Sequence, residues 1–163
     1  EKGGLKRIPP LGTVPHTQSG AITRAAASVS EFLAAKYVCV FTTTGDSARR
    51  MGRLREPIPM IAFTYDEATR RRMSVMWGVR SVIVPFLQTT DEIVLSVDTY
   101  LIDSGLANVG DVVVIVLGSP PGIPGSTNDL RVLRVGDAVN EAAPGYRHAA
   151  AQLMSMTAKS VKD

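Results

Sequence analysis

The residues Val112-Val113-Val114-Ile115-Val116 form the longest β-branched run in this 163-residue chain. Branched side chains favour extended strands, and this run does not alternate with polar residues. A strand with two apolar faces is typical of the centre of a parallel sheet that helices cover on both sides. The run therefore predicts an α/β fold around a buried, mostly parallel sheet.

Helical and strand patterns alternate along the rest of the chain. Apolar residues at three- and four-residue spacing indicate helices, and shorter apolar runs indicate strands. The expected helices cover 19–36, 48–54, 67–76 and 90–104, and the expected strands cover 37–41, 60–63, 81–84, 111–118 and 129–135. This order predicts a three-layer α/β/α sandwich with a five-stranded, mostly parallel sheet. The short link before the last strand predicts that this strand is antiparallel.

Two acidic pairs, 66–67 and 91–92, could be interpreted as paired catalytic carboxylates. In each pair the glutamate lies three residues after a threonine, Thr64 or Thr89, which is the spacing of a capping box. Acids in the first turn of a helix also complement the helix dipole. We therefore interpret both pairs as helix caps rather than as acid–base catalysts.

A hydroxyl-rich turn, Thr42-Thr43-Thr44-Gly45-Asp46-Ser47, follows the first expected strand and opens a helix. The first N–H groups of a helix lack internal partners, and the helix dipole favours anions there. The turn could therefore surround a phosphate. Alternatively, Thr44 caps the helix while the other hydroxyls satisfy the turn.

A second loop, from Gly118 to Thr127, contains three glycines and three prolines and also leaves a strand. In open α/β sheets, ligands bind outside the carboxyl ends of the strands, where both loops should lie. An exposed helix terminus contributes only ~0.3–1 kcal/mol and a hydrogen bond to a charged group ~1.5–3 kcal/mol, whereas micromolar binding needs about 8 kcal/mol. We therefore expect both loops to close over one ligand.

Sequence patterns for other functions are missing. There is no GxGxxG, no lysine-bearing phosphate loop and no G-x-S-x-G, and the only histidines, His16 and His148, lie near the two ends. We therefore expect no histidine triad and no metal cluster. The net charge is only +3, and aromatic residues do not interleave with the arginine clusters, so we expect a solvated or subunit-contact face and no nucleic acid.

The sequence also indicates a location. No apolar run approaches the ~20 residues of a membrane span, and no signal-peptide pattern opens the chain, so we expect no membrane association. The lone Cys39 lies in a strand pattern and is expected to be a buried thiol, which fits a reducing cytoplasm. Trp77 is expected to be a core or interface aromatic residue.

Several short motifs, in their order and spacing, resemble the C-terminal regulatory domain of pyruvate kinase, of the bacterial type. The motifs are Val40 to Arg49, Pro59 to Thr64, Trp77-Gly78-Val79, Val84-Pro85, Gly110 to Val116, Gly118 to Gly122 and Gly125 to Asn128, with Ile8 to Leu11 and Val14 to Thr17 before them. The resemblance covers about residues 7–136. It rests on several agreeing motifs rather than on one.

The resemblance implies three segments. Residues 1–18 would be a linker from a missing N-terminal catalytic barrel, 19–136 the α/β domain, and 137–163 a C-terminal extension that is either loosely docked or an oligomer clasp. The barrel would transfer phosphate from phosphoenolpyruvate to ADP in glycolysis. This chain alone is therefore expected to be no enzyme, with no catalytic or metal-binding residue and no cofactor, since Mg and K are expected only with the barrel.

The resemblance also implies an allosteric effector site and a homo-oligomer. The residues expected to bind the effector's phosphate are Thr42, Thr43, Thr44, Gly45, Ser47, Gly122 and Gly125. Asp46 stands where many relatives carry a hydroxyl or a basic residue. A carboxylate ~4 Å from a phosphate costs up to roughly 4 kcal/mol at a dielectric constant of 20, so Asp46 either points away or selects a different effector.

The range 86–99 contains no lysine or arginine, and this absence bears on the effector. Relatives that bind fructose 1,6-bisphosphate often use a basic residue there. A hexose monophosphate or AMP is therefore favoured over the bisphosphate as the phosphorylated partner. The alternative is a free-standing structural or interaction domain whose ligand site has decayed.

Overall fold

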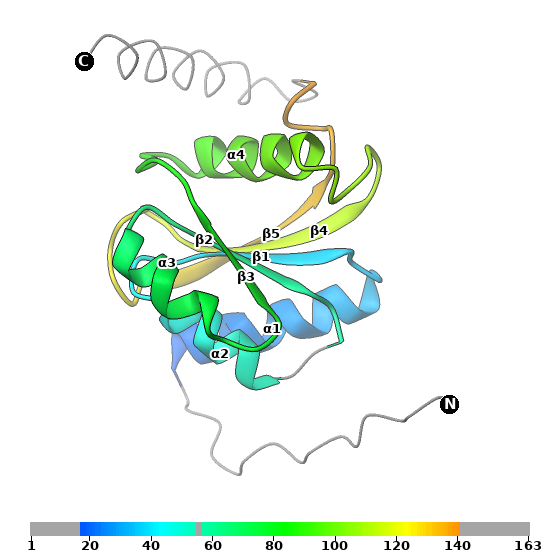
Figure 1. The fold of residues 1–163 in the computed structure, drawn as a ribbon. Helices are drawn as coiled ribbons and strands as arrows, with labels where there is room; N and C mark the ends of the chain where they lie inside the picture. Colours follow the sequence, from blue (N-terminus) through cyan, green and yellow to red (C-terminus); the bar gives the residue numbers. More distant parts are fainter. Residues whose placement is uncertain (1–16, 55–56, 141–163) are drawn as a thin grey trace, which may run out of the picture.

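The computed structural model describes residues 17–54 and 57–140, which form three layers (Figure 1). The helices are α1 (Gln18–Phe32), α2 (Asp46–Leu54), α3 (Glu67–Ser74) and α4 (Thr90–Asp103). The strands are β1 (Tyr37–Phe41), β2 (Met60–Thr64), β3 (Val79–Ile83), β4 (Val112–Gly118) and β5 (Thr127–Arg134). Helix α4 covers one face of the sheet, and α1, α2 and α3 cover the other. The predicted α/β/α sandwich is confirmed.

The sheet has the order β3-β2-β1-β4-β5. Strands β1 to β4 run parallel, and β5 pairs with β4 in the antiparallel direction, as predicted. The five residues from Val113 to Leu117 are all 0% exposed, which confirms that β4 is buried on both faces. The strand with the strongest β-branched character is thus internal to the sheet.

The buried sheet separates two apolar clusters. Cys39, Ile61 and Ile115 pack on the side of α4, with Ile93 and Leu101 of that helix. The neighbouring strand residues point to the opposite side because side chains alternate along a strand. They meet residues of the other three helices there, in a cluster of Ala26, Ala27, Val38, Val40, Ala48, Met51, Ala62, Met73, Val114 and Val116, among others.

The two predicted capping boxes had different outcomes. At α4, Thr89 Oγ1 accepts from the Glu92 N–H, and the Glu92 carboxylate accepts from the Thr89 N–H, as predicted. At α3 the prediction is wrong, because Asp66 is the cap and accepts from the Thr69 N–H at 2.7 Å. Thr64 is still in β2, so the chain needs two more residues before the helix can begin.

Three helix or strand boundaries and the expectation for Trp77 need correction. Helix α1 ends at Phe32 instead of residue 36, because the chain turns through a left-handed residue, Ala34, to enter β1. Helix α3 ends at Ser74, and β3 begins two residues earlier than predicted, at Val79. Trp77 in the intervening turn is 79% exposed, so of the two expected roles the core role is wrong and the interface role stays a prediction.

The predictions for the terminal segments lie outside the described residues, except at 17–18 and 137–140. Over residues 17–54 and 57–140, no helix has the length and apolar character that crossing a membrane requires.

Candidate functional site

A cavity lies at the carboxyl ends of the parallel strands. Its walls come from the turn after β1, the β4–β5 loop, and the residues that follow β2 and β3. Six of the seven residues predicted to bind phosphate line it, namely Thr42, Thr43, Thr44, Ser47, Gly122 and Gly125. The structure therefore brings the two predicted loops together at one rim of the sheet.

Gly45, the seventh residue, lies behind the turn instead of on the cavity wall. It is buried, has φ +87°, and approaches Thr69 and Met73 of α3 so closely that a Cβ would be 3.4 Å from Met73 Cγ. Its N–H donates to Thr42 Oγ1 at 2.9 Å. In this geometry Gly45 shapes the turn, since a left-handed conformation beside a packed helix favours glycine.

Two hydroxyls of the turn form hydrogen bonds within the turn itself. Thr42 Oγ1 satisfies the turn through Gly45, and Thr44 Oγ1 accepts from the Asp46 N–H at 3.4 Å. The backbone N–H groups of Thr43, Thr44 and Ser47, however, have no hydrogen-bond partner within the described part of the chain. Three donors at the start of α2 thus remain available to an anion.

The two loops are joined directly. The hydroxyls of Ser47 and Thr127 form a buried hydrogen bond of 2.5 Å between the start of α2 and the start of β5. The Ser19 hydroxyl, at the start of α1, donates to the Gly125 carbonyl oxygen at 3.3 Å. At the other end of the loop, Ser119 and the Asn128 side chain exchange two hydrogen bonds of 2.7 Å. These contacts fix both ends of the β4–β5 loop over the cavity.

Arg50 supplies a positive charge that the sequence analysis did not anticipate. It lines the cavity, and its guanidinium forms no hydrogen bond or ion pair with the described residues. The signal was its position three residues after Ser47, because residues three apart lie on the same face of a helix. Asp46 also lines the cavity, but Arg49 pairs with its carboxylate at 2.5 Å. This pairing reduces the expected repulsion between Asp46 and an anion.

The part of the cavity lining that follows β2 and β3 is largely apolar. The rings of Tyr65 and Phe86 meet edge to face with centroids 5.1 Å apart, and both are partly exposed. Gly122 lies against Phe86, because a Cβ there would be only 2.7 Å from Phe86 Cε2. The cavity lining thus combines polar groups that suit an anion with apolar groups that suit the body of a small ligand.

Across residues 17–54 and 57–140, no group of three or more His, Cys, Asp or Glu side chains is arranged to hold a metal ion. Complete burial raises the pKa of the Cys39 thiol well above its usual range, so it is not a thiolate nucleophile. The predicted buried thiol is confirmed.

Comparison with known proteins gives consistent results. A family model described as "Pyruvate kinase, alpha/beta domain" matches residues 20–133. The chain is 43% identical to a pyruvate kinase of Mycobacterium tuberculosis over 129 residues. This alignment covers 79% of this chain and 27% of the relative. It is 38% identical over 131 residues to a pyruvate kinase of Corynebacterium glutamicum, covering 80% of this chain and 28% of the relative.

A solved structure has the same fold. The crystal structure of a pyruvate kinase from Cryptosporidium parvum superposes with a TM-score of 0.67 at 20% identity, over 76% of this chain and 24% of that one. At this identity the likeness concerns the fold alone. The chain spans about a quarter of the length of the relatives it matches.

Proposed function

The chain belongs to the pyruvate kinase family, through its C-terminal α/β domain, and we propose that it binds a phosphorylated effector in the cavity between its two loops. The observation that carries this proposal is the set of donors at the start of α2. The N–H groups of Thr43, Thr44 and Ser47 have no partner among the described residues, and Arg50 lies beside them. Hydrogen bonds to a charged group contribute roughly 1.5–3 kcal/mol each, so four such contacts could reach the ~8 kcal/mol of micromolar binding.

The charge of the cavity favours one phosphate over two. Arg50 is the only cationic cavity residue without an ion pair in the described part of the chain, and 86–99 contains no lysine or arginine. A hexose monophosphate or AMP therefore fits better than fructose 1,6-bisphosphate. The apolar groups of Tyr65 and Phe86 would contact the sugar or the base.

The activity of a whole pyruvate kinase enters as part of the same proposal. Phosphate transfer from phosphoenolpyruvate to ADP, with its Mg and K ions, would take place on a catalytic barrel and not in this domain. The domain would regulate that reaction through a homo-oligomer in the cytoplasm.

A ligand titration tests the proposal. We expect AMP or glucose 6-phosphate to raise the melting temperature of the 163-residue chain more than fructose 1,6-bisphosphate does, because a ligand that binds only the native state stabilises it by ~2.7 kcal/mol at 100 times its Kd. If none of the three compounds raises the melting temperature, the proposal fails.

Two matched substitutions locate the site. Arg50→Gln should weaken binding of the stabilising compound about tenfold or more, since it removes a charged hydrogen bond. Arg53→Gln is the control, because Arg53 is exposed on the same helix and does not line the cavity.

The double variant Thr44→Ala, Ser47→Ala should also weaken binding, with Thr99→Ala on the exposed side of α4 as its control. Equal affinity in all four would place the ligand elsewhere.

A second candidate is an interaction domain without a ligand. Two apolar side chains in the α3–β3 turn, Val75 and Trp77, are 85% and 79% exposed, which favours a contact surface. Light scattering that shows a discrete oligomer, together with no response to any phosphate compound, would support this candidate.

A further inference from the structure

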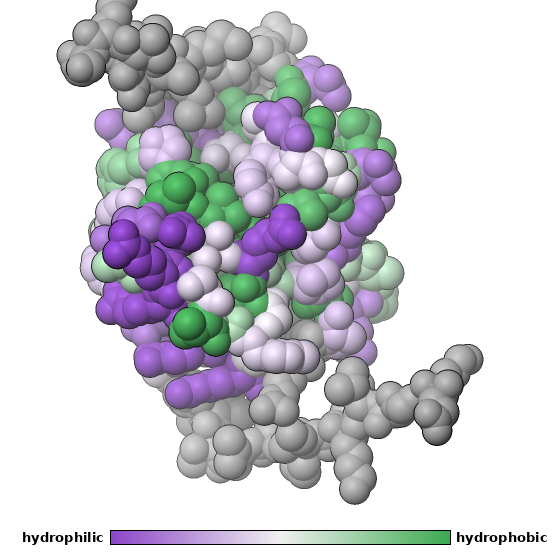
Figure 2. All heavy atoms as spheres, viewed as in Figure 1, coloured by the Kyte–Doolittle hydropathy of each residue, from purple (hydrophilic) through white to green (hydrophobic). Residues whose placement is uncertain are grey.

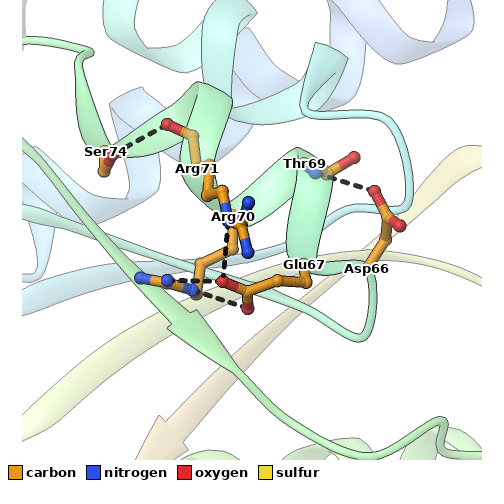
Figure 3. A network of polar contacts seen from close by, with 6 residues as sticks. All are labelled: Asp66, Glu67, Thr69, Arg70, Arg71 and Ser74. Atoms are coloured by element: carbon orange, nitrogen blue, oxygen red, sulfur yellow. Dashed lines mark hydrogen bonds and ion pairs between the residues drawn. The ribbon is translucent and has the colours of Figure 1, made fainter.

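Thr69 links helix α3 to the hydroxyl-rich turn, residues 42–47. Its side chain is 1% exposed, and its hydroxyl donates to the Thr43 carbonyl oxygen at 3.0 Å. The backbone N–H of Thr69 is itself held by Asp66 Oδ2 at 2.7 Å, in the first turn of the helix (Figure 3). The residue is therefore fixed both by its own backbone and by its contact with the turn.

This contact sets the direction of one of the three available donors. The Thr43 carbonyl and the Thr44 N–H belong to one planar peptide unit, and in a trans peptide they point in opposite directions. The only cis peptide bond in the described residues is Ser119–Pro120, so this unit is trans. Since the carbonyl points to α3, the Thr44 N–H points away from it. Thr44 lines the cavity and Thr69 does not.

From this geometry we infer that Thr69 is a positioning residue of the proposed phosphate site, which aims the Thr44 N–H into the cavity. The inference rests on the proposed function, since it concerns the same site. Without the Thr69 hydroxyl, the peptide unit between Thr43 and Thr44 would be free to rotate, and a preorganised donor would become an unoriented one.

Arg72 extends this arrangement to the surface of α3. Its Nη2 donates to Thr69 Oγ1 at 2.7 Å. A hydroxyl has a single hydrogen, so an oxygen that accepts from Arg72 keeps its hydrogen for the Thr43 carbonyl. The neighbouring arginines do not take part, because Arg70 and Arg71 both turn to Glu67 (Figure 3). Figure 2 shows the hydrophilic residues gathered over α3, where this group meets solvent.

A purely structural role for Thr69 makes a different prediction. Its Cγ2 lies 3.6 Å from the position of a Cβ on Gly45, so the side chain also fills space behind the turn. If packing were its whole role, Thr69→Val would preserve the site and Thr69→Ser would loosen it. If the hydroxyl is what matters, the order is reversed.

The test is a titration of the ¹⁵N-labelled 163-residue chain with inorganic phosphate, followed by the amide resonances. In the wild type we expect the Thr43, Thr44 and Ser47 amides to shift. Thr69→Val should weaken phosphate binding about tenfold, which corresponds to about 1.4 kcal/mol, and should remove the shift of Thr44. Thr69→Ser should stay within about twofold of the wild type.

The outcomes separate this inference from the proposed function. If phosphate moves none of the three amides in the wild type, the proposed function fails, and this inference fails with it. If phosphate binds Thr69→Val as tightly as the wild type and still shifts Thr44, only the role of Thr69 is overturned. Should Thr69→Val not fold, Thr69→Ala and Thr69→Ser decide, because both lose the methyl group and only serine keeps the hydroxyl. Weaker binding in the alanine variant alone supports the inference, and equal binding in the two variants overturns it.

Discussion

Asp98 shows how one buried carboxylate can hold a segment in place. It lies in α4, is 0% exposed, and accepts hydrogen bonds from three backbone N–H groups of the turn after β5. Gly136 donates to its Oδ1 at 2.7 Å, and Ala138 and Val139 donate to its Oδ2 at 2.9 Å. The charge is therefore stabilised by backbone dipoles that converge on it.

This arrangement predicts a large effect from a small change. In Asp98→Asn an NH2 group, which donates and does not accept, replaces one of the two carboxylate oxygens, so at least one of the three N–H groups loses its acceptor. We expect the free energy of unfolding in urea to fall by about 2–4 kcal/mol. Asp103→Asn, at the exposed end of the same helix, should change it by no more than about 0.5 kcal/mol. If Asp98→Asn lowered the free energy of unfolding by less than about 1 kcal/mol, these three hydrogen bonds would contribute little to stability.

Single residues also mark the limit of what the sequence could predict. The threonines and Ser47 of the hydroxyl-rich turn were identified because their type and order have a local meaning. The contact between Asp98 and Gly136 joins residues 38 positions apart, and that between Thr69 and Thr43 joins residues 26 apart. No local pattern encodes such pairs, since they depend on how the helices lie over the sheet.

Acidic residues in the first turn of helix α3 interact with arginines about one turn later (Figure 3). The Glu67 carboxylate accepts from Arg70 Nε and Nη2 at 2.9 and 2.6 Å and from Arg71 Nε at 3.2 Å. The hydrogen bonds from Arg70 are the main cause that lowers the pKa of Glu67 from 4.5 to about 2. The hydrogen bonds from Thr69 likewise lower the pKa of Asp66.

These shifts predict how α3 responds to acid. A carboxylate with a lower pKa in the folded state stabilises the fold above its unfolded pKa, and this contribution is lost as the pH falls. The contribution of Glu67 should therefore disappear between pH 4.5 and about 2. The melting temperatures of the wild type and Glu67→Gln should converge over this range, whereas a constant difference would contradict the assignment. Asp103→Asn, which removes a carboxylate without an ion pair in the described residues, should not reproduce this convergence.

The elements themselves were largely predictable, and their errors have local causes. Apolar runs identified β1, β2 and β4, because the internal strands of this sheet are almost purely apolar. The boundaries failed where two signals compete, as at Thr64, which has capping-box spacing but ends as the last residue of β2. Strand β3 lies at the edge of the sheet, and its residues are mostly half-exposed. The polar Arg80 interrupts its apolar pattern, so the first two residues of the strand were not predicted.

The meeting of the two loops follows from topology more than from any motif. Strands β1 and β4 are neighbours and parallel, so the turn after one and the loop after the other must leave the same edge of the sheet. The sequence could predict this once the strand order was assumed. It could not predict that the Ser47 and Thr127 hydroxyls would join the two segments, nor that Tyr65 and Phe86 would line the cavity.

The same central sheet predicts that the two cores unfold together. Leu101, in the cluster beneath α4, and Met73, in the cluster on the opposite face, are 0% and 1% exposed. Replacing either by alanine should cost about 2–5 kcal/mol, because each leaves a cavity in a packed core. Every internal strand contributes side chains to both clusters, so neither cluster can lose its packing while the sheet stays intact.

We therefore expect Leu101→Ala and Met73→Ala to shift one common urea transition to lower concentration. The measurement is the loss of amide signals from α3 and from α4, followed beside circular dichroism at each urea concentration. Coincident curves in the wild type and in both variants would indicate a single cooperative unit. If Met73→Ala released α3 at a urea concentration where α4 kept its signals, the sheet would not couple its two faces. In that case a ligand bound at the turn would stabilise only one side of the domain.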